Sequence, residues 1–118
     1  MFLIVFQKKI TKQTYKDICK VHYKLLTYDY GHKYTTDIYE TTLEIFYRAI
    51  MEILKSLKYG SSNQKELYQF YIKSKEFKKV TKINWQVFNT KQRINKLILK
   101  YCPMLLYKLY KFKFRKNN

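Results

Sequence analysis

Three clusters of basic side chains are the feature of this sequence with the clearest chemistry. They lie in one short connection, in the segment that soon follows it, and along one side of the carboxy-terminal tail: Lys75, Lys78, Lys79 and Lys82; Lys91, Arg93 and Lys96; Lys108, Lys111, Lys113, Arg115 and Lys116. Ammonium and guanidinium groups neutralise phosphates and release the counterions that surround them. The clusters therefore predict contact with a phosphate backbone. About six to ten such contacts would weaken binding by about 10³–10⁵-fold between low and moderate salt.

Residue types suited to catalysis or to metal binding are scattered along the chain. The eight carboxylates are scattered, and His22 and His32 fall in different expected elements. Cys19 and Cys102 form no CxxC motif, so two reduced thiols are expected. The sequence therefore predicts a protein that is not an enzyme, with no catalytic residue, metal, cofactor or small-molecule substrate.

The charge of the whole chain also indicates an anionic partner. A length of 118 residues fits one domain, and that domain would carry a net charge of +17 with a pI near 9.8. Charge of this size repels itself in the compact state, which leaves an isolated copy marginally stable. Nucleic acid and an anionic membrane surface are the two partner classes that would relieve the repulsion.

The amino-acid usage suggests an AT-rich genome as the source. Phe, Tyr, Met, Ile, Asn and Lys, whose codons are rich in A and T, make up more than half of the chain, and Lys outnumbers Arg 22 to 3. An organelle, endosymbiont, virus or plasmid genome would fit this bias. The apolar run MFLIVF is too short for a secretory signal or a membrane span, and no arginine-rich presequence is visible. If the protein works in an organelle, we therefore expect it to be made there.

Hydrophobic periodicity predicts both strands and helices. Alternation of apolar and polar residues predicts strands over residues 21–29, 67–73, 83–87 and 107–116. Helical spacing predicts a helix over about residues 36–57, where Asp37 and Glu40 have the spacing of a capping box, and a second over residues 90–102, ending before Pro103. Residues 58–66 read as a loop, and MFLIVF would add an edge strand within a basic extension over residues 1–20.

This element order predicts an α+β fold. Strand, helix, strands, helix and strand close into a split βαβ, ferredoxin-like sandwich, with the helices on one face of a mostly antiparallel sheet. We expect this domain to cover residues 21–118, after the basic N-terminal extension of residues 1–20.

Two stretches carry the signature of a known family. The family's first strand reads R-L-x-A-[YF]-D-H, and residues 24–30, KLLTYDY, match its basic–apolar start and its aromatic–Asp end. Mitochondrial members continue with G-H-x-K, which residues 31–33, GHK, resemble. Ser74 and Lys79 lie near the serine and lysine of a second pattern, and residues 84–87 and 90–93 match its continuation, Q-[YF]-E-x and T-H-x-R. Over residues 22–114 the chain thus resembles the universal small-subunit ribosomal protein ten family, although the family's proline-rich loop is replaced here by GSSNQKE.

The resemblance implies a structural constituent of the head of the small ribosomal subunit. It would end the first helix near Ile50, make Glu52–Lys58 a strand, and extend a hairpin towards neighbouring head proteins through Tyr59, Gly60, Ser61, Ser62, Asn63 and Gln64. Together with the charge clusters it implies contacts to small-subunit ribosomal RNA from Lys33, Lys75, Lys78, Lys79, Lys82, Thr90, Lys91, Arg93, Lys111, Lys113 and Arg115. Such a protein binds no membrane and is not a homo-oligomer.

Combined with the AT-rich coding, the resemblance favours a mitochondrial ribosome and a gene in the organelle. Two alternatives stay open. One is a small basic nucleic-acid-binding protein of a mobile element or virus. The other is a basic accessory subunit of an organelle membrane complex, for which MFLIVF and PMLLYKLY would be interfacial segments.

Overall fold

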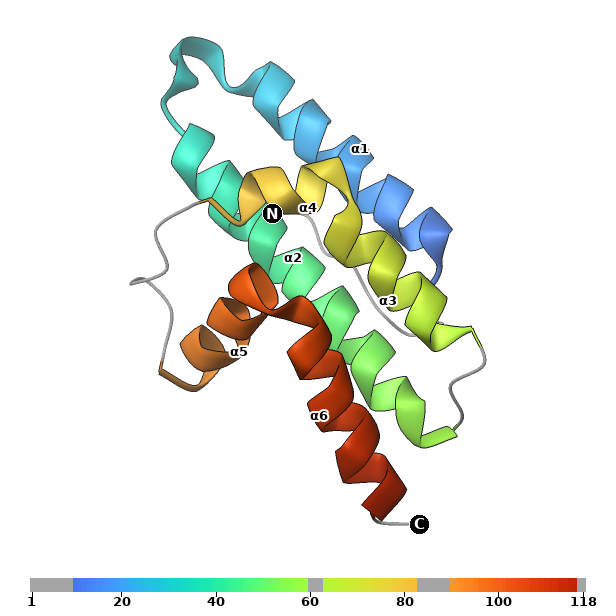
Figure 1. Cartoon of the computed structure of the whole chain (residues 1–118). Helices are drawn as coiled ribbons and strands as arrows, with labels where there is room; N and C mark the ends of the chain where they lie inside the picture. The colour runs from blue at the N-terminus through green and yellow to red at the C-terminus, as the bar shows by residue number, and fades with distance from the viewer. Residues whose placement is uncertain (1–9, 60–62, 83–89, 117–118) are drawn as a thin grey trace.

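The computed structural model describes residues 10–59, 63–82 and 90–116, and every regular element in these ranges is a helix (Figure 1). Two short 3₁₀ segments accompany the α-helices. In chain order the elements are α1 (Lys12–Tyr28), η1 (Tyr30–His32), α2 (Thr35–Lys55), η2 (Ser56–Tyr59), α3 (Gln64–Lys73), α4 (Lys75–Val80), α5 (Thr90–Tyr101) and α6 (Pro103–Lys116).

The predicted α+β sandwich is therefore wrong: within the described ranges the chain forms helices and no sheet. Residues 21–29 belong to α1 and the turn after it, residues 67–73 to α3, and residues 107–116 to α6. The helix predicted over residues 36–57 is confirmed as α2, and the one over residues 90–102 is confirmed as α5. The expected strands at MFLIVF and at residues 83–87 lie outside the described residues.

The strand predicted over residues 67–73 shows why alternation was misleading. Tyr68, Phe70 and Ile72 alternate, but the side chains that are buried are Tyr68, Tyr71 and Ile72, at helical spacing i, i+3 and i+4. A seven-residue stretch this rich in apolar residues satisfies both periods. Packing against α2 and the start of α1 selects the helix.

Helix α2 begins and ends where periodicity placed it, within two residues. Its N-cap is Tyr34, whose side chain makes no capping hydrogen bond, so the capping box predicted at Asp37 is wrong. Asp37 lies instead in the first turn, where its charge faces the positive end of the helix dipole. The end near Ile50 and the strand Glu52–Lys58, both taken from the family resemblance, are also wrong, because α2 continues to Lys55 with Ile53 and Leu54 buried.

The core is built around α2, which runs through the middle of the molecule with α1, α3, α4 and α6 packed against it (Figure 1). Its buried side chains meet aromatic rings from the neighbouring helices. Phe46 is in edge-to-face contact with Tyr71 of α3 and Phe77 of α4, with ring centroids 6.5 and 5.9 Å apart. Aromatic pairs of this kind add to the free energy of apolar burial.

Two buried tyrosine hydroxyls connect elements that are distant in sequence. Tyr71 donates a hydrogen bond to the backbone oxygen of Thr11 at 2.7 Å, and Tyr68 donates one to the backbone oxygen of Pro103 at 2.5 Å. Burial raises the pKa of both hydroxyls, so both remain protonated donors. The first bond fixes the start of α1 on α3. Since α1 also buries Ile18, the boundary expected after residue 20 falls inside a helix that belongs to the core.

Candidate nucleic-acid interface

Helix α4 separates its apolar and basic residues onto opposite faces. Phe77 and Val80 are buried, and Phe77 packs against Phe46 of α2. The exposed lysines are Lys75, Lys78 and Lys79 of the helix and Lys82 in the turn after it. Ser74 begins the helix by accepting a hydrogen bond from the backbone N–H of Phe77 at 3.3 Å. The segment that sequence analysis treated as a basic connection is therefore a helix with a lysine face.

These four lysines and Lys73 line one hollow of about 520 Å³, which we call the lysine cradle. Its lining residues are Lys73, Lys75, Lys78, Lys79 and Lys82. None of the five takes part in an ion pair with another described residue. Five like charges around one concavity repel each other, and an anion placed among them lowers that repulsion.

The basic surface continues from the cradle onto α1. Lys73 also lines a second hollow of about 500 Å³, together with Lys12, whose ammonium lies 5.1 Å from the centroid of the Phe70 ring. Along α1 an exposed lysine recurs at every fourth residue: Lys12, Lys16, Lys20 and Lys24. This row was not predicted as a site, because residues 1–20 were assigned to an extension and residues 21–29 to a strand. The i, i+4 spacing was the available signal.

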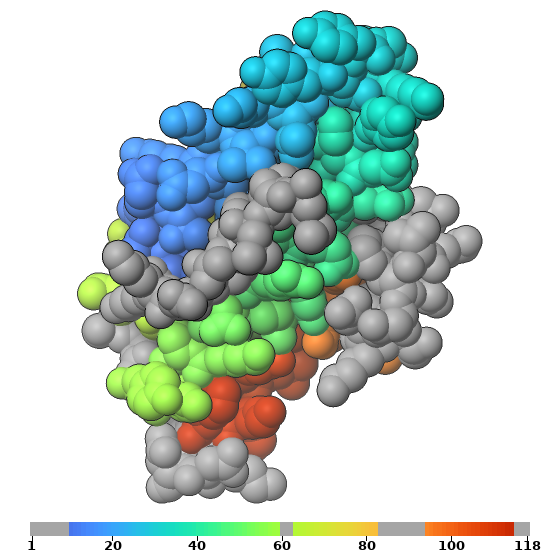
Figure 2. All heavy atoms as spheres, turned by 180° about the vertical axis from the view of Figure 1, so that it is seen from behind, coloured from blue at the N-terminus to red at the C-terminus, as the bar shows by residue number. Residues whose placement is uncertain are grey.

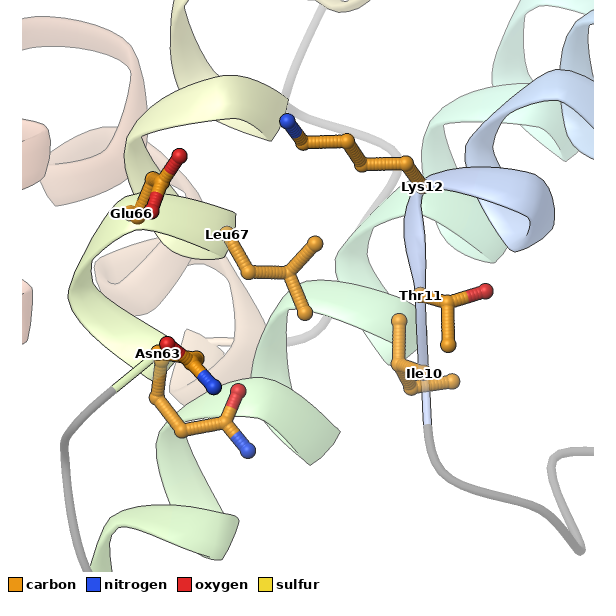
Figure 3. A pocket seen from close by; sticks show the side chains of 7 residues that line it. Ile10, Thr11, Lys12, Asn63, Glu66 and Leu67 are labelled. Atoms are coloured by element: carbon orange, nitrogen blue, oxygen red, sulfur yellow. The ribbon is translucent and has the colours of Figure 1, made fainter.

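A third hollow, of about 270 Å³, lies where the first turns of α1 and α3 meet (Figure 3). Ile10 and Leu67 face each other across it, and Lys12 extends along its rim towards α3 (Figure 3). Thr11, Asn63, Gln64 and Glu66 complete the lining. With one ammonium and one carboxylate, this hollow lacks the concentration of positive charge that the cradle has.

Of the other residues predicted to bind RNA, those whose side chains the structure describes do not line the cradle. For the remaining four it does not describe the side chain. Lys33 is exposed in the α1–α2 turn, with its ammonium 5.5 Å from the centroid of the Tyr34 ring. Lys111 and Lys113 are exposed on α6. Because they are two residues apart in a helix, they lie on different sides of it and not on one side, as they would in a strand. Thr90, Lys91 and Arg93 lie in the first turn of α5 and Arg115 near the end of α6, and the side chains of these four are not among those described.

The prediction that Lys96 belongs to the second basic cluster and contacts phosphate is wrong. It is fully buried, forms an ion pair with Glu44 of α2, and its ammonium lies 4.9 Å from the centroid of the Tyr47 ring. Burial lowers the pKa of this lysine, and the contact with Glu44 opposes that shift. Lys96 therefore attaches α5 to α2 and is not available to a phosphate.

The predicted protein-contact hairpin is not a hairpin. Tyr59 ends η2, Asn63 precedes α3 and Gln64 is the first residue of α3, where it is buried. Gly60, Ser61 and Ser62 lie outside the described residues. This segment joins two helices, and no strand borders it in the described ranges.

Polar side chains of α1, α2 and α4 pair with one another, and two of them, His22 and Thr42, are buried. The Nδ1 atom of His22 lies 2.6 Å from the hydroxyl oxygen of Thr42, and Tyr23 donates a hydrogen bond to Glu76. Burial lowers the pKa of His22, and the bond to Glu76 raises the pKa of Tyr23 to about 12. Within the described residues no three potential metal ligands come together.

Comparisons with protein-family models, curated proteins and solved structures found no match to this chain. Among the described helices, none combines the length and the apolar content that a membrane span requires. In the part of the chain that the structure describes, the lysine cradle and the lysine row of α1 bring the most basic side chains together.

Proposed function

We propose that this protein binds RNA through the phosphate backbone and works as a non-catalytic component of a ribonucleoprotein. The observation that supports this best is the cradle, where five lysines without described ion pairs surround one hollow. Lysine binds phosphate as a point charge and does not read base sequence. The proposal is therefore one of affinity for a polyanion rather than of sequence recognition.

We propose that the particle is the small subunit of a mitochondrial ribosome. The partners would be its RNA and the neighbouring proteins of its head. The support is the composition, the net charge of +17 and the short motif matches. The α+β fold that the family resemblance implied does not occur in the described residues, so the fold lends that resemblance no weight. Co-sedimentation of a tagged copy with small subunits would support the particle, whereas a free or DNA-bound pool would favour the mobile-element alternative.

The RNA proposal is tested by titrating a labelled single-stranded RNA at several salt concentrations. If all five cradle lysines contact phosphates, log Kobs should fall against log[salt] with a slope of about −3.5 or steeper. The double variant Lys78→Gln, Lys82→Gln removes two contacts and should flatten that slope by about 1.4.

A matched control is available at the connection between α2 and α3. Lys58 and Lys65 are exposed and lie outside the cradle, so Lys58→Gln, Lys65→Gln removes the same charge from a different place. The control should keep the slope of the unchanged protein. Equal flattening in both variants would mean that net charge, and not the cradle, determines binding.

A second candidate function comes from the outer face of α6. Leu105, Leu109 and Phe112 are exposed at spacing i, i+4 and i+7, and Lys108 and Lys113 flank them. A basic helix with an apolar outer stripe also fits an anionic membrane surface. This observation favours the accessory subunit of an organelle membrane complex over other rivals to RNA binding.

Flotation with vesicles that contain phosphatidylglycerol separates the two candidates. A membrane subunit should float with the vesicles at high salt and lose this property in Leu109→Glu, Phe112→Glu. Binding that disappears at high salt and is unaffected by the variant would come from charge alone and would exclude the stripe as an anchor.

A further inference from the structure

The connection between α1 and α2 displays aromatic side chains at the end of the molecule. Tyr28, Tyr30 and Tyr34 have 62, 84 and 54% of their surfaces exposed, and His32 between them is exposed as well. Figure 2 shows this part of the chain as the tip at the top of the view. Rings such as Phe46, Tyr71 and Phe77 pack into the core, where folding removes their apolar surface from water. The tip keeps three tyrosine rings exposed within seven residues, whereas the exposed rings of Tyr59, Tyr101 and Phe112 are far apart in the sequence.

The backbone beneath these rings is fixed by specific bonds. Asp29 is buried, and its carboxylate accepts hydrogen bonds from the Tyr34 backbone N–H at 2.8 Å and from the Thr35 hydroxyl at 2.7 Å. Gly31 and His32 have φ values of +74° and +56°, in the left-handed region. A non-glycine residue held in this region costs free energy, and such residues concentrate at functional sites.

Helix α1 connects the tip to α4, the helix that carries Lys75, Lys78 and Lys79 of the cradle. Tyr23 of α1 donates a hydrogen bond to Glu76 in the first turn of α4, and Tyr28 follows five residues later on the same helix. Five residues of α-helix span about 7.5 Å. A strand whose phosphates lie on α4 therefore has the tip within reach of its next nucleotides.

We propose that the α1–α2 tip is a stacking platform for unpaired bases, with Tyr30 and Tyr34 as the rings on which the bases lie. The proposal rests on the proposed function, since the cradle supplies the phosphate contacts that bring a strand to the tip. Base–aromatic stacking tolerates any base and tightens binding by about 5- to 150-fold per base. Lys33, beside Tyr34, would meet the phosphate that joins two stacked nucleotides.

The experiment compares two single strands with the same phosphates. One is a 12-nucleotide oligoadenylate, and the other is an abasic strand of the same length. The full chain should bind the oligoadenylate at least about tenfold more tightly, because only this strand can stack. The double variant Tyr30→Ala, Tyr34→Ala should bring that ratio to about one while leaving the affinity for the abasic strand unchanged.

Two further variants show whether the effect belongs to the tip. Tyr30→Phe, Tyr34→Phe keeps the rings and should keep the tenfold ratio, because stacking uses the ring and not the hydroxyl. Tyr59→Ala is the matched control: Tyr59 is 83% exposed with the Lys58 ammonium 4.9 Å from its ring centroid, but it lies at the end of η2. Its loss should leave the ratio unchanged.

The outcomes separate this inference from the function on which it rests. No preference for the oligoadenylate, with binding of the abasic strand intact, would overturn the platform and leave phosphate binding standing. Equal losses from Tyr59→Ala and from the tip variant would overturn it too. Failure of both strands to bind would overturn the platform and the proposed function together.

Discussion

The residues of the α1–α2 turn show how single positions fix local geometry. The hydrogen bond from Thr35, more than that from the Tyr34 backbone, lowers the pKa of Asp29, so its carboxylate is ionised at neutral pH. Gly31 has a positive φ where a Cβ would meet no atom within 4 Å. Its conformation, and not a lack of space, is therefore what requires glycine.

Replacing Gly31 gives a prediction at this scale. Gly31→Ala should lower the free energy of unfolding by about 1 kcal/mol, because an L-residue is strained in the left-handed region. Urea denaturation followed by circular dichroism measures the change. Gly31→Asn is the control and should lose less, since asparagine tolerates this region better. Equal stability of all three proteins would contradict the turn geometry.

The buried histidine predicts a dependence of stability on pH. Burial, more than the opposing charge of Glu76, lowers the pKa of His22, and Lys79 acts in the same direction as burial. The folded pKa is thus below the unfolded value of about 6.5, so the unfolded chain binds the proton more readily. The free energy of unfolding should fall as the pH drops from about 7 towards 5.

Two histidine variants assign this effect. His22→Asn should reduce the loss of stability between pH 7 and pH 5, measured by urea denaturation at each pH. His32→Asn changes an exposed histidine and should leave the loss as it is in the unchanged protein. If His32→Asn alone removed the dependence, the burial of His22 would not be its cause.

At the scale of elements, helices with a long apolar face were predictable and short apolar stretches were not. Over α2 the buried positions repeat through five turns, so the period of 3.6 is unmistakable. In α3 and α6 the tyrosines and phenylalanines favour strands by intrinsic preference, and the chain is rich in both, with 13 Tyr and 8 Phe. Only tertiary packing decides such segments.

Helix α6 offers a direct test of this point. As a strand, residues 110, 112 and 114 would share one face, but in the helix Tyr110 and Phe114 pack on the core while Phe112 is 66% exposed. Tyr110→Ala and Phe114→Ala should each lower the free energy of unfolding by about 1–3 kcal/mol. Phe112→Ala should change it by less than about 0.5 kcal/mol. Three similar losses in chemical denaturation would favour the strand.

The candidate site was partly predictable at this scale as well. Lys75, Lys78, Lys79 and Lys82 were named from their density alone, and the structure brings all four to one hollow. Lys73 and the α1 row were not named, because their placement depends on reading helices instead of strands. Lys96 was misassigned to a basic surface, because its pairing with Glu44 joins positions 52 residues apart.

For the whole molecule, the excess of positive charge predicts that stability depends on the ionic surroundings. The net charge of +17 repels itself, and salt screens this repulsion. The melting temperature of the free protein should therefore rise between about 50 and 500 mM salt. RNA added at low salt should raise it further, because a ligand of the folded state stabilises that state. A melting temperature that is indifferent to both would contradict an account based on charge.

The measurement that tests the central claim most directly is acetylation of lysines in the full chain with and without bound RNA, resolved residue by residue in a mass spectrometer. The account predicts that RNA protects the cradle lysines Lys73, Lys75, Lys78, Lys79 and Lys82, while Lys58 and Lys65 react as they do in the free protein. Protection of Lys58 and Lys65 with unchanged reaction in the cradle would contradict it.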